Sequence, residues 1–511
     1  MNSNPLSELG NPHGGPPPES AGPGDAWSGY TSALSGRYAS AAMQWVWSPR
    51  RKFEAWRRVW LALAEAQHDM GLPVSRQQVE AMRSALALTD ADFARAAEHE
   101  KRLRHDVMAH VHAFGDAAPA AKGVIHLGMT SQDVNCNSET PIIAEALDLT
   151  IAKTARLVAD LGSFASRWQG LACLGFTHYQ AAQPTTMGKR AASWGHDLML
   201  CLERLDATRG AMRLRGLKGA TGTQASFLAL FDGDAAKVAE LERRFVARLG
   251  WPADRLHGFT GQTYPRVADA FVLGDLAALA AACHKLANDV RLLSNRKELD
   301  EPFEKEQIGS SAMPYKRNPM RCERATGLCR FVISLASSGY DTAATQWLER
   351  TLDDSSNRRL TLPEAFLAID GVLDTLHSVC DEKASGGGGL VVHEASIRRN
   401  LMDELPFMAT EVVLMEAVKL GRDRQQVHEA IRRHSQEAGM RVKQQGLAND
   451  LVERLRGDPL LKGVDLESAL RPERHVGLAR EQAAEFARVA AMVAGRYAKQ
   501  IAALGKVELI V

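Results

Sequence analysis

Apolar residues along this chain recur with a helical period from about residue 40 onward. In the segment 142–168 they fall at intervals of three, four and seven residues, which places them on one face of a helix more than about six turns long. Comparable patterns predict helices over 188–214, 267–294, 322–338 and 360–380. Alternation of apolar and polar residues between turn residues is scarce, so the predicted fold class is all-α. The apolar face of the first segment comprises Ile143, Leu147, Ile151, Val158, Leu161 and Trp168.

Long helices with broad apolar faces must pack against partners, inside one chain or between subunits, which favours a helical bundle and an oligomer. The C-terminal third instead predicts shorter helices, with breaks at Gly421 and Gly446 and an N-cap at Asp423. A glycine-rich stretch at 381–390, DEKASGGGGL, is the expected junction. The predicted division is a disordered tail over 1–34, an N-terminal helical domain over 35–130, a central long-helix bundle domain over 131–388 and a C-terminal helical domain over 389–511.

The composition limits the classes of partner and compartment. With 62 basic against 61 acidic residues the net charge is +1, which gives no general attraction to nucleic acid or to anionic membranes. The seven cysteines show no CxxC spacing, which favours a reducing, cytoplasmic compartment. The most apolar run, 270–287, contains Asp275, His284 and Lys285 and predicts a buried helix rather than a membrane span. Residues 1–36 lack Lys and Arg, which fits neither a secretory signal nor a mitochondrial presequence.

The stretch 307–320, QIGSSAMPYKRNPM, combines hydroxyls and cations on a backbone rich in breakers of regular structure. A serine hydroxyl such as that of Ser310 or Ser311 acts as a base only where a cationic, water-excluding environment stabilises the alkoxide, and Lys316 could supply that charge. Glycine before the serines and prolines after them suit a segment that closes over a substrate. A solvated surface loop with incidental charges is the alternative interpretation.

A second candidate is His178 in the stretch LGFTHYQAAQPTT at 174–186. An imidazole exchanges protons near neutral pH, and here it lies in a polar segment before a predicted helix. A lone histidine is more often structural, so both interpretations remain open. Hydrogen-bonding groups around it come from Thr177, Gln180, Gln183, Thr185 and Thr186.

A third candidate is the stretch KRLRHDVMAHVH at 101–112. If it is helical, His105 and His112 share a face but lie about 10 Å apart, too far to bind one metal ion. The histidines at 428 and 434 likewise lack the HExxH spacing, so no metal site is predicted. His105 and Asp106 are hypothesised to orient a substrate, with ordinary surface charges as the alternative.

Cations interleaved with hydroxyls form the fourth candidate. They lie near the loop of residues 307–320 and in QWLERTLDDSSNRRL at 346–360. Guanidinium groups suit carboxylate and phosphate oxygens because they donate bidentate hydrogen bonds. The alternative is a solvated helix whose arginines pair with Asp353 and Asp354. The residues concerned are Arg317, Arg321, Arg324, Arg350, Ser355, Ser356, Arg358 and Arg359.

Together these stretches resemble a known family. GSSAMPYKRNP is similar to the signature loop GSSxMPxKxNP of the aspartase/fumarase superfamily, and its variable positions resemble the adenylosuccinate lyase family of the animal type. The resemblance continues in order from about residue 35 to 450. Further matching stretches are SGRYAS, EHEKRLRHDVMAHVH, HLGMTS, LGFTHYQAAQ, KGATGTQASFL, TGQTY, QWLERTLDDSSNRR and ELPFMATE.

The resemblance implies a three-domain, all-α fold with a long central bundle, a homotetramer with active sites shared between subunits, and no cofactor. It also implies β-elimination of fumarate from adenylosuccinate, giving AMP, and from SAICAR, giving AICAR. Ser310 would be the general base, with Ser311 its neighbour and rival. Lys316 would stabilise the carbanion intermediate, and His178 would protonate the leaving nitrogen.

The binding positions carried over by the same resemblance divide into four groups. One group would contact the nucleotide, a second its phosphate, a third would orient the substrate, and a fourth would lie around the succinyl and base moieties. Asn318 and Glu323 also match the motif in supporting roles. Arg37 and Tyr38 form the nucleotide group, and Arg350, Ser355 and Arg359 the phosphate group. Arg104, His105 and Asp106 form the orienting group, and Thr130, Ser131, Gln262 and Arg324 the group around the succinyl and base moieties.

Departures from the family pattern are few. The tail, the glycine insert at 381–390 and the region beyond about 450 lie outside the matched motifs, and HLGMTS is followed by QDVNCN, a polar stretch with residues of its own.

Argininosuccinate lyase is the nearest enzymatic alternative, but its substrate lacks a phosphate. A catalytically silent helical scaffold is the alternative from another class, and retention of Ser310, Lys316 and His178 argues against it. The near-zero net charge disfavours a nucleic-acid-binding module.

Overall fold

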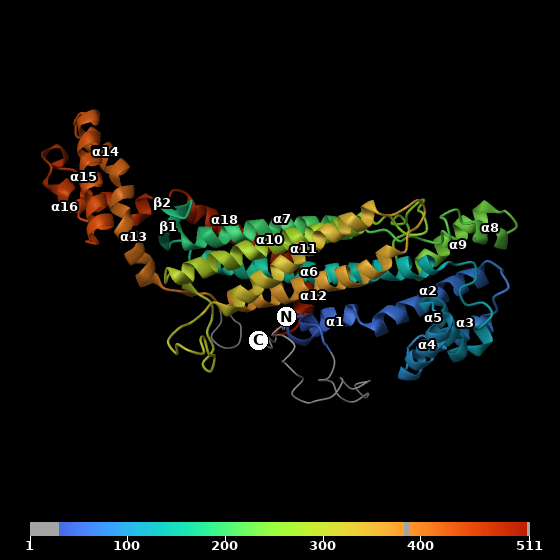
Figure 1. The fold of residues 1–511 in the computed structure, drawn as a ribbon. Helices are drawn as coiled ribbons and strands as arrows, with labels where there is room; N and C mark the ends of the chain where they lie inside the picture. The colour runs from blue at the N-terminus through green and yellow to red at the C-terminus, as the bar shows by residue number, and fades with distance from the viewer. Residues whose placement is uncertain (1–29, 383–388, 508–511) are drawn as a thin grey trace, which may run out of the picture.

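The computed structural model describes residues 30–382 and 389–507, and α-helices dominate them (Figure 1). This confirms the all-α prediction. Most of the segment predicted to be a disordered tail, residues 1–29, and residues 383–388 of the glycine insert lie outside the described residues.

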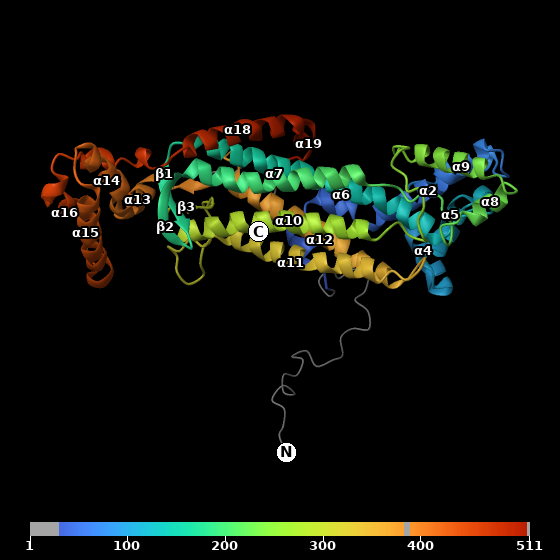
Figure 2. The ribbon, with the colours of Figure 1, turned by 90° about the horizontal axis from the view of Figure 1, so that it is seen from above.

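A bundle of long, nearly parallel helices forms the middle of the molecule (Figures 1 and 2). Apolar side chains from all of these helices share one core, which includes Leu161, Leu198, Leu279 and Leu373. The buried faces follow the three-, four- and seven-residue spacing, so the bundle is the direct consequence of that pattern. Its helices are α6 (Ser131–Arg167), α7 (Met187–Ala211), α10 (Val267–Asn295), α11 (Met320–Ala344) and α12 (Asp353–Cys380).

Predicted and observed helix bounds agree best where the helix is apolar throughout. Helix α10 matches the predicted 267–294 to within one residue. Helices α6 and α12 begin several residues before their predicted starts, because their first turns carry polar residues that are buried or line a pocket. In α6, Asp133 and Asn137 are almost completely buried and hydrogen-bonded, which an apolar pattern cannot reveal.

Helix α10 is also long and apolar enough to cross a membrane by length and composition alone. It nevertheless packs in the bundle, with Leu276, Leu279 and Cys283 fully buried in the shared core. The helix predicted over the run 270–287 is therefore a core helix of the bundle.

The N-terminal helices form a second core at one end of the bundle. Trp56 and Trp60 are its largest members, and both are almost completely buried. Residues 214–249, which follow α7 in the chain, pack into the same core. The elements of this N-terminal region are η2 (Leu34–Tyr38), α1 (Ala41–Val46), α2 (Pro49–Asp69), α3 (Arg76–Ser84), α4 (Asp90–Leu103), α5 (Asp106–Ala117), η3 (Pro119–Ala121), α8 (Ala225–Leu230) and α9 (Ala235–Arg248). Leu34 of η2 and Met43 and Val46 of α1 pack into the core of the bundle instead.

The C-terminal helices form a third core at the opposite end. Asp423 caps α15 by accepting hydrogen bonds from the N–H groups of Gln425 and Gln426, and Gly446 ends it in the left-handed conformation, both as predicted. The last long helix, α18, returns to the bundle, where Phe486 and Ala490 join its core. The elements are α13 (Glu394–Met408), α14 (Thr410–Lys419), α15 (Arg424–Gln445), α16 (Leu451–Gly457), η4 (Pro459–Leu461), α17 (Leu466–Ala469), η5 (Pro472–Arg474), α18 (Ala479–Arg496) and α19 (Ala498–Ala503).

Two small antiparallel pairs of strands lie at the C-terminal end of α6 (Figures 1 and 2). Strands β1 (Ala172–Thr177) and β2 (Gln180–Thr186) form a hairpin, so the polar stretch around His178 is its turn. Strand β3 (Leu299–Asp300) pairs with β4 (Val391–Val392), on the far side of the glycine insert in the chain.

Candidate active site

A cationic pocket lies where the N-terminal ends of α6 and α12 meet α1 and α2. Its floor is apolar, and four arginines and a lysine line the rest together with a few neutral polar groups and one carboxylate. Such a mixture of apolar wall and convergent polar groups is typical of a small-molecule site. The polar lining consists of Lys52, Gln132, Asn135, Glu139, Arg266, Arg350, Ser355, Arg358 and Arg359.

Buried ion pairs fix the arginines deepest in this pocket. Arg358 donates to Asp269 at 2.7 Å and to Glu139 at 2.9 Å. Arg266 and Arg350 share Asp354, at 2.7 and 3.0 Å. Burial alone would raise the pKa of Glu139, but Arg358, Arg266 and a neighbouring lysine outweigh it and lower that pKa below its usual value. The pocket therefore keeps its carboxylate ionised and its guanidinium groups oriented.

The predicted orienting residues lie at the rim of the pocket. Arg359 forms an ion pair with Asp106 at 2.5 Å, which joins α12 to the start of α5. His105 is the N-cap of α5, and its Nε2 lies 3.3 Å from the Oγ of Ser131. Arg104 adopts the left-handed conformation with φ 55°, so the helix of residues 90–103 ends there. The continuous helix considered for 101–112 is thus wrong, because this turn separates α4 from α5.

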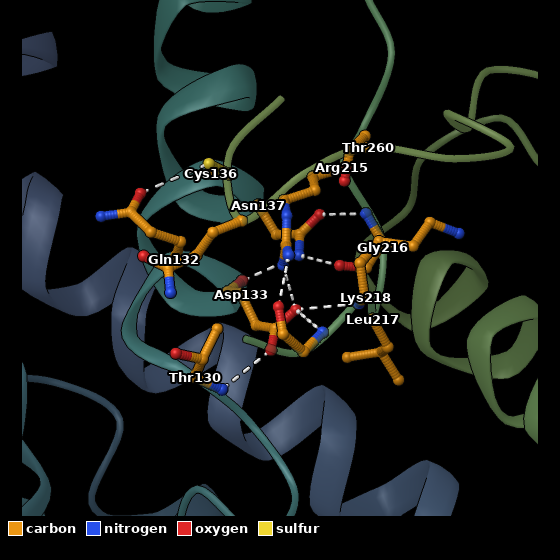
Figure 3. Close-up of polar contacts among 12 residues, drawn as sticks. Thr130, Gln132, Asp133, Cys136, Asn137, Arg215, Gly216, Leu217, Lys218 and Thr260 are labelled. Carbon is orange, nitrogen blue, oxygen red and sulfur yellow. Dashed lines mark hydrogen bonds and ion pairs between the residues drawn. The ribbon is translucent and has the colours of Figure 1, made fainter. Parts of the chain in front are cut away.

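A buried aspartate holds the start of α6 against two neighbouring loops (Figure 3). Asp133 accepts hydrogen bonds from the backbone N–H of Thr130 at 2.8 Å and of Lys218 at 2.9 Å, and it forms an ion pair with Arg215. Both charged side chains are fully buried. The same Arg215 donates to the carbonyl oxygen of Gly261 at 3.1 Å. One ion pair therefore fixes the backbone around several predicted binding positions.

Gln262 lies in one of those loops. Its backbone N–H donates to Glu349 and its side chain donates to Ala220, both at 2.9 Å. The two loops approach so closely that a Cβ at Gly222, where φ is +85°, would lie 1.7 Å from the carbonyl oxygen of Thr260. Only glycine fits there.

Arg37 and Tyr38 lie in η2, which packs against the middle of α12. The backbone of Tyr38 lies so close to Gly371 that a Cβ on Gly371 would approach its carbonyl oxygen to 2.9 Å. The N–H of Ser40 donates to Asp370 at 2.7 Å, and Lys153 forms an ion pair with the same carboxylate. Arg37 is exposed and Tyr38 is half-buried.

His178 occupies the turn of the β1–β2 hairpin. It and Tyr179 both have positive φ, 54° and 57°, which matches a two-residue hairpin turn between Thr177 and Gln180. The imidazole is exposed.

The loop of residues 307–320 leads from β3 to α11, and residues 307–319 have no helix or strand, as predicted; Met320 begins α11. Ser310 accepts a hydrogen bond from the N–H of Met313 at 3.2 Å, and Asn318 donates to the carbonyl oxygen of Gly309 at 2.9 Å. Ser311 and Lys316 are exposed. The loop therefore has an internal framework and presents its hydroxyl and ammonium groups outward. Glu323 and Arg324 follow in the first turns of α11, Glu323 exposed and Arg324 half-buried.

Within one chain the predicted residues do not form one site. Those near α5, α6 and α12 gather around the cationic pocket, whereas His178 and the loop of residues 307–320 lie at the other end of the bundle (Figure 1). Helix α6 alone has 37 residues, which corresponds to a length of about 55 Å. The groups at the two ends can act on one molecule only if different chains supply them.

The sequence patterns missed several residues of the pocket. Lys52, Glu139 and Arg266 line it, yet none was assigned a role. Gln132 and Asn135 belong to the stretch QDVNCN, whose polar character after HLGMTS was the signal that could have found them. Lys52 had no such signal, because it lies outside the matched stretches.

Comparison with known proteins adds to this geometry. A family model described as "Lyase" matches residues 39–334, and a model described as "Adenylosuccinate lyase C-terminus" matches residues 406–486. The fold and the motif-bearing loop thus define a lyase of the aspartase/fumarase type.

Curated relatives are similar over nearly the whole chain. Adenylosuccinate lyase of Saccharomyces cerevisiae is 47% identical over 90% of this chain and 94% of its own length. The enzymes of Schizosaccharomyces pombe and Schistosoma mansoni are 45% and 42% identical, each over 90% of this chain and over 94% and 95% of their own lengths. The chain belongs to the adenylosuccinate lyase family.

Solved structures support the fold. The 3-carboxy-cis,cis-muconate lactonizing enzyme of Pseudomonas putida has a TM-score of 0.77 at 23% identity, covering 91% of this chain and all of its own. A fumarate lyase of Mesorhizobium has a TM-score of 0.74 at 21% identity, covering 90% of this chain and 99% of its own. The long-helix bundle is therefore the fold of this group of enzymes.

Proposed function

We propose that this protein is a C–N lyase that eliminates fumarate from adenylosuccinate, giving AMP, and from SAICAR, giving AICAR, in purine biosynthesis. The observation that carries the proposal is the cationic pocket at the N-terminal ends of α6 and α12, in a chain of the adenylosuccinate lyase family. A substrate with a phosphate and two carboxylates needs a local cluster of cations, because a net charge of +1 gives the protein no general attraction to anions.

The phosphate is proposed to bind Arg350, Ser355 and Arg359. All three line the pocket, and Arg350 and Ser355 are half-buried there. Arg350 precedes α12 and the other two lie in its first two turns, and such guanidinium and hydroxyl donors suit the oxygens of a phosphate monoester. Arg37 and Tyr38 are proposed to contact the nucleotide from η2.

The elimination is proposed to start at Ser310. Its alkoxide removes a proton from the carbon next to a carboxylate, and Lys316 stabilises the negative charge that then develops on that carboxylate. The C–N bond breaks as the carbon–carbon double bond of fumarate forms. His178 donates a proton to the departing nitrogen, because an amine expelled as an anion would be too basic a leaving group.

The remaining predicted residues are proposed to hold the substrate between these groups. His105 orients it, and could share in proton transfer through the contact of its Nε2 with Ser131. Asp106 keeps Arg359 at the rim of the pocket. Arg104 orients the substrate together with His105 and Asp106. Around the succinyl and base moieties lie Thr130, Ser131, Gln262 and Arg324, and Asn318 and Glu323 have supporting roles.

A homotetramer with shared active sites is proposed for two reasons. The first is the separation of His178 and Ser310 from the cationic pocket within one chain. The second is a set of large apolar side chains exposed on the long helices, which a second chain would bury. These include Phe271 and Leu292 on α10, Ile333 and Tyr340 on α11, and Leu360 on α12.

The chemistry assigned to Ser310, Lys316 and His178 calls for no metal ion or organic cofactor, and we propose that the protein uses none. We also propose a cytoplasmic location and the domain bounds 35–130, 131–388 and 389–511. The proposed C-terminal domain, 389–511, includes α18, although this helix packs against α6 and α7 of the central domain.

An ultraviolet assay of the purified protein with adenylosuccinate tests the proposed function. The expected result is conversion to AMP and fumarate, undiminished by EDTA, with no turnover of argininosuccinate as the control. Lack of turnover by a well-folded oligomer would refute the activity and favour a helical scaffold. Loss of activity in EDTA that added metal restores would refute the metal-free chemistry.

A further inference from the structure

Lys52 is a cation of the pocket for which the described residues provide no anionic partner within ion-pair distance. It lies in the first turn of α2 and lines the pocket with Arg350, Ser355 and Arg359. Its Nζ makes no hydrogen bond or ion pair with any residue of 30–382 or 389–507. It lies 5.2 Å from the ring centroid of Phe53 and 5.1 Å from that of Trp56.

The other cations of the pocket are all paired. Each guanidinium lies within 3.0 Å of a carboxylate: Arg358 with Asp269 and Glu139, Arg266 and Arg350 with Asp354, and Arg359 with Asp106. The carboxylates named above are therefore already paired with arginines. Among the described residues, no carboxylate lies within ion-pair distance of Lys52, and the carboxylates with the strongest electrostatic effect on it, Glu139 and Asp106, are paired with arginines.

The surroundings of Lys52 make this imbalance costly. Burial lowers its pKa, and Arg359 lowers it further, against the opposing effects of Glu139 and Asp106. A bound anion would remove this cost by supplying the missing charge. A second unused donor points the same way, because Nη1 of the buried Arg266 has no hydrogen-bond partner among the described residues.

The position of Lys52 is fixed by the fold. Ser48 caps α2 by accepting a hydrogen bond from Arg51, and Pro49 occupies the first turn, so the helix start is well defined. Trp56, one turn further on, is completely buried in the N-terminal core. The ammonium group of Lys52 lies near the rings of Phe53 and Trp56, and the residue lines the pocket.

We propose that Lys52 is a further substrate-binding residue, whose ammonium group donates to the phosphate of the nucleotide beside Arg350, Ser355 and Arg359. This inference rests on the proposed function and extends the phosphate site to a residue of α2. A phosphate monoester carries more than one negative charge near neutral pH, so it can accept from the arginines and still bind an additional cation. The ammonium is a compact point charge, which suits the oxygen that the planar guanidinium groups leave free.

Calorimetric titration of the intact oligomer tests the proposal, with wild type, Lys52→Met, Lys52→Arg and the distant exposed control Lys443→Met. The ligands are AMP and inorganic phosphate, which carry the phosphate, and adenosine and fumarate, which do not. Lys52→Met should bind AMP and inorganic phosphate at least about tenfold more weakly, the effect of losing a charge-assisted hydrogen bond. Its affinity for adenosine and fumarate should be unchanged, Lys52→Arg should recover part of the loss, and Lys443→Met should match wild type.

Unchanged affinity of Lys52→Met for both AMP and inorganic phosphate would overturn the proposal. Weaker binding of fumarate with unchanged binding of phosphate would also overturn it, by assigning Lys52 to the succinyl group. In turnover assays, Lys52→Met should have a raised KM for adenylosuccinate and a kcat that changes much less, because the interaction exists in both the ground state and the transition state.

A measurement on the wild-type protein covers the case in which the variants fail to fold. Inorganic phosphate should slow acetylation of Lys52, followed by peptide mass spectrometry, and leave acetylation of Lys443 unchanged. Equal rates at Lys52 with and without phosphate would contradict the proposal. If wild type binds phosphate through Lys52 but does not cleave adenylosuccinate, the proposed function fails and the anion site remains. If it cleaves adenylosuccinate and Lys52→Met binds phosphate normally, only this inference fails.

Discussion

His105 and His178 lie at opposite ends of the same long helix. The imidazole of His105 contacts Ser131, the first residue of α6, at 3.3 Å, whereas His178 lies in the hairpin that follows the last residue of α6. Helix α6 is about 55 Å long, so no movement of a side chain or loop brings the two histidines together in one chain. If both act on one substrate, the active site lies between subunits.

Replacing Ser310 tests the assignment of the general base. Ser310→Ala should lower kcat by about 10³-fold or more, because the proton on carbon then has no positioned acceptor. Binding of AMP should change little, since Ser310 is proposed to act on the succinyl part of the substrate, which AMP lacks. Ser311→Ala is the matched control and should keep most of the activity; if it is the inactive variant instead, the role of base passes to Ser311.

The buried pair of Asp133 and Arg215 should be important for stability. Asp133→Ala leaves Arg215 buried without a counter-charge and removes the acceptor for three backbone N–H groups, those of Thr130, Lys218 and Gly219 (Figure 3), so we expect a loss of about 3–5 kcal/mol in the free energy of unfolding. Denaturant unfolding followed by circular dichroism measures it. The double variant Asp133→Ala, Arg215→Met should regain part of the loss, and equal stability of wild type and Asp133→Ala would contradict this interpretation.

Stability should also depend on pH through His110. This residue is 7% exposed and stacks on Phe53, and burial, with contributions from Arg57 and Lys52, lowers its pKa to about 4 from an ordinary 6.5. The unfolded chain therefore binds a proton that the folded chain does not, so this contribution is fully present above pH 6.5 and is lost as the pH falls toward 4. Its size is about 3 kcal/mol.

The check is the denaturant midpoint of wild type and His110→Asn from pH 4 to 7. The variant should be less sensitive to pH over this interval, whereas His428→Asn, on the exposed face of α15, should keep the wild-type slope. Identical slopes for wild type and His110→Asn would show that His110 does not carry the effect.

The sequence predicted the parts of the fold that follow from local pattern. The bounds of α10 were predicted to within one residue because apolar residues recur along its full length, and the cap of α15 at Asp423 followed from residue type. The start of α12 was missed because its first turns face the pocket and are polar. The hairpin around His178 was missed because its two strands carry few β-branched or aromatic residues and its turn uses non-glycine residues at positive φ.

The site shows the same limit. Motif resemblance found the loop around Ser310 and, in the pocket, Arg350, Ser355 and Arg359, but Lys52 and Glu139 come from helices whose proximity depends on tertiary packing. No spacing in the sequence brings residue 52 beside residue 350. Likewise, residues that the motifs group together by function, such as His105 and His178, are separated by the full length of the bundle in one chain.

Mixing two inactive variants is the most direct test of a site formed between subunits. His105→Gln and His178→Gln are purified separately, each expected to be nearly inactive, then mixed under conditions in which native mass spectrometry of differently tagged chains proves subunit exchange. Adenylosuccinate turnover should appear in the mixture, because some sites then receive an intact histidine from each of two chains, and it should be absent from either variant treated alone. Proven exchange with no activity above that of the separate variants would contradict a shared site.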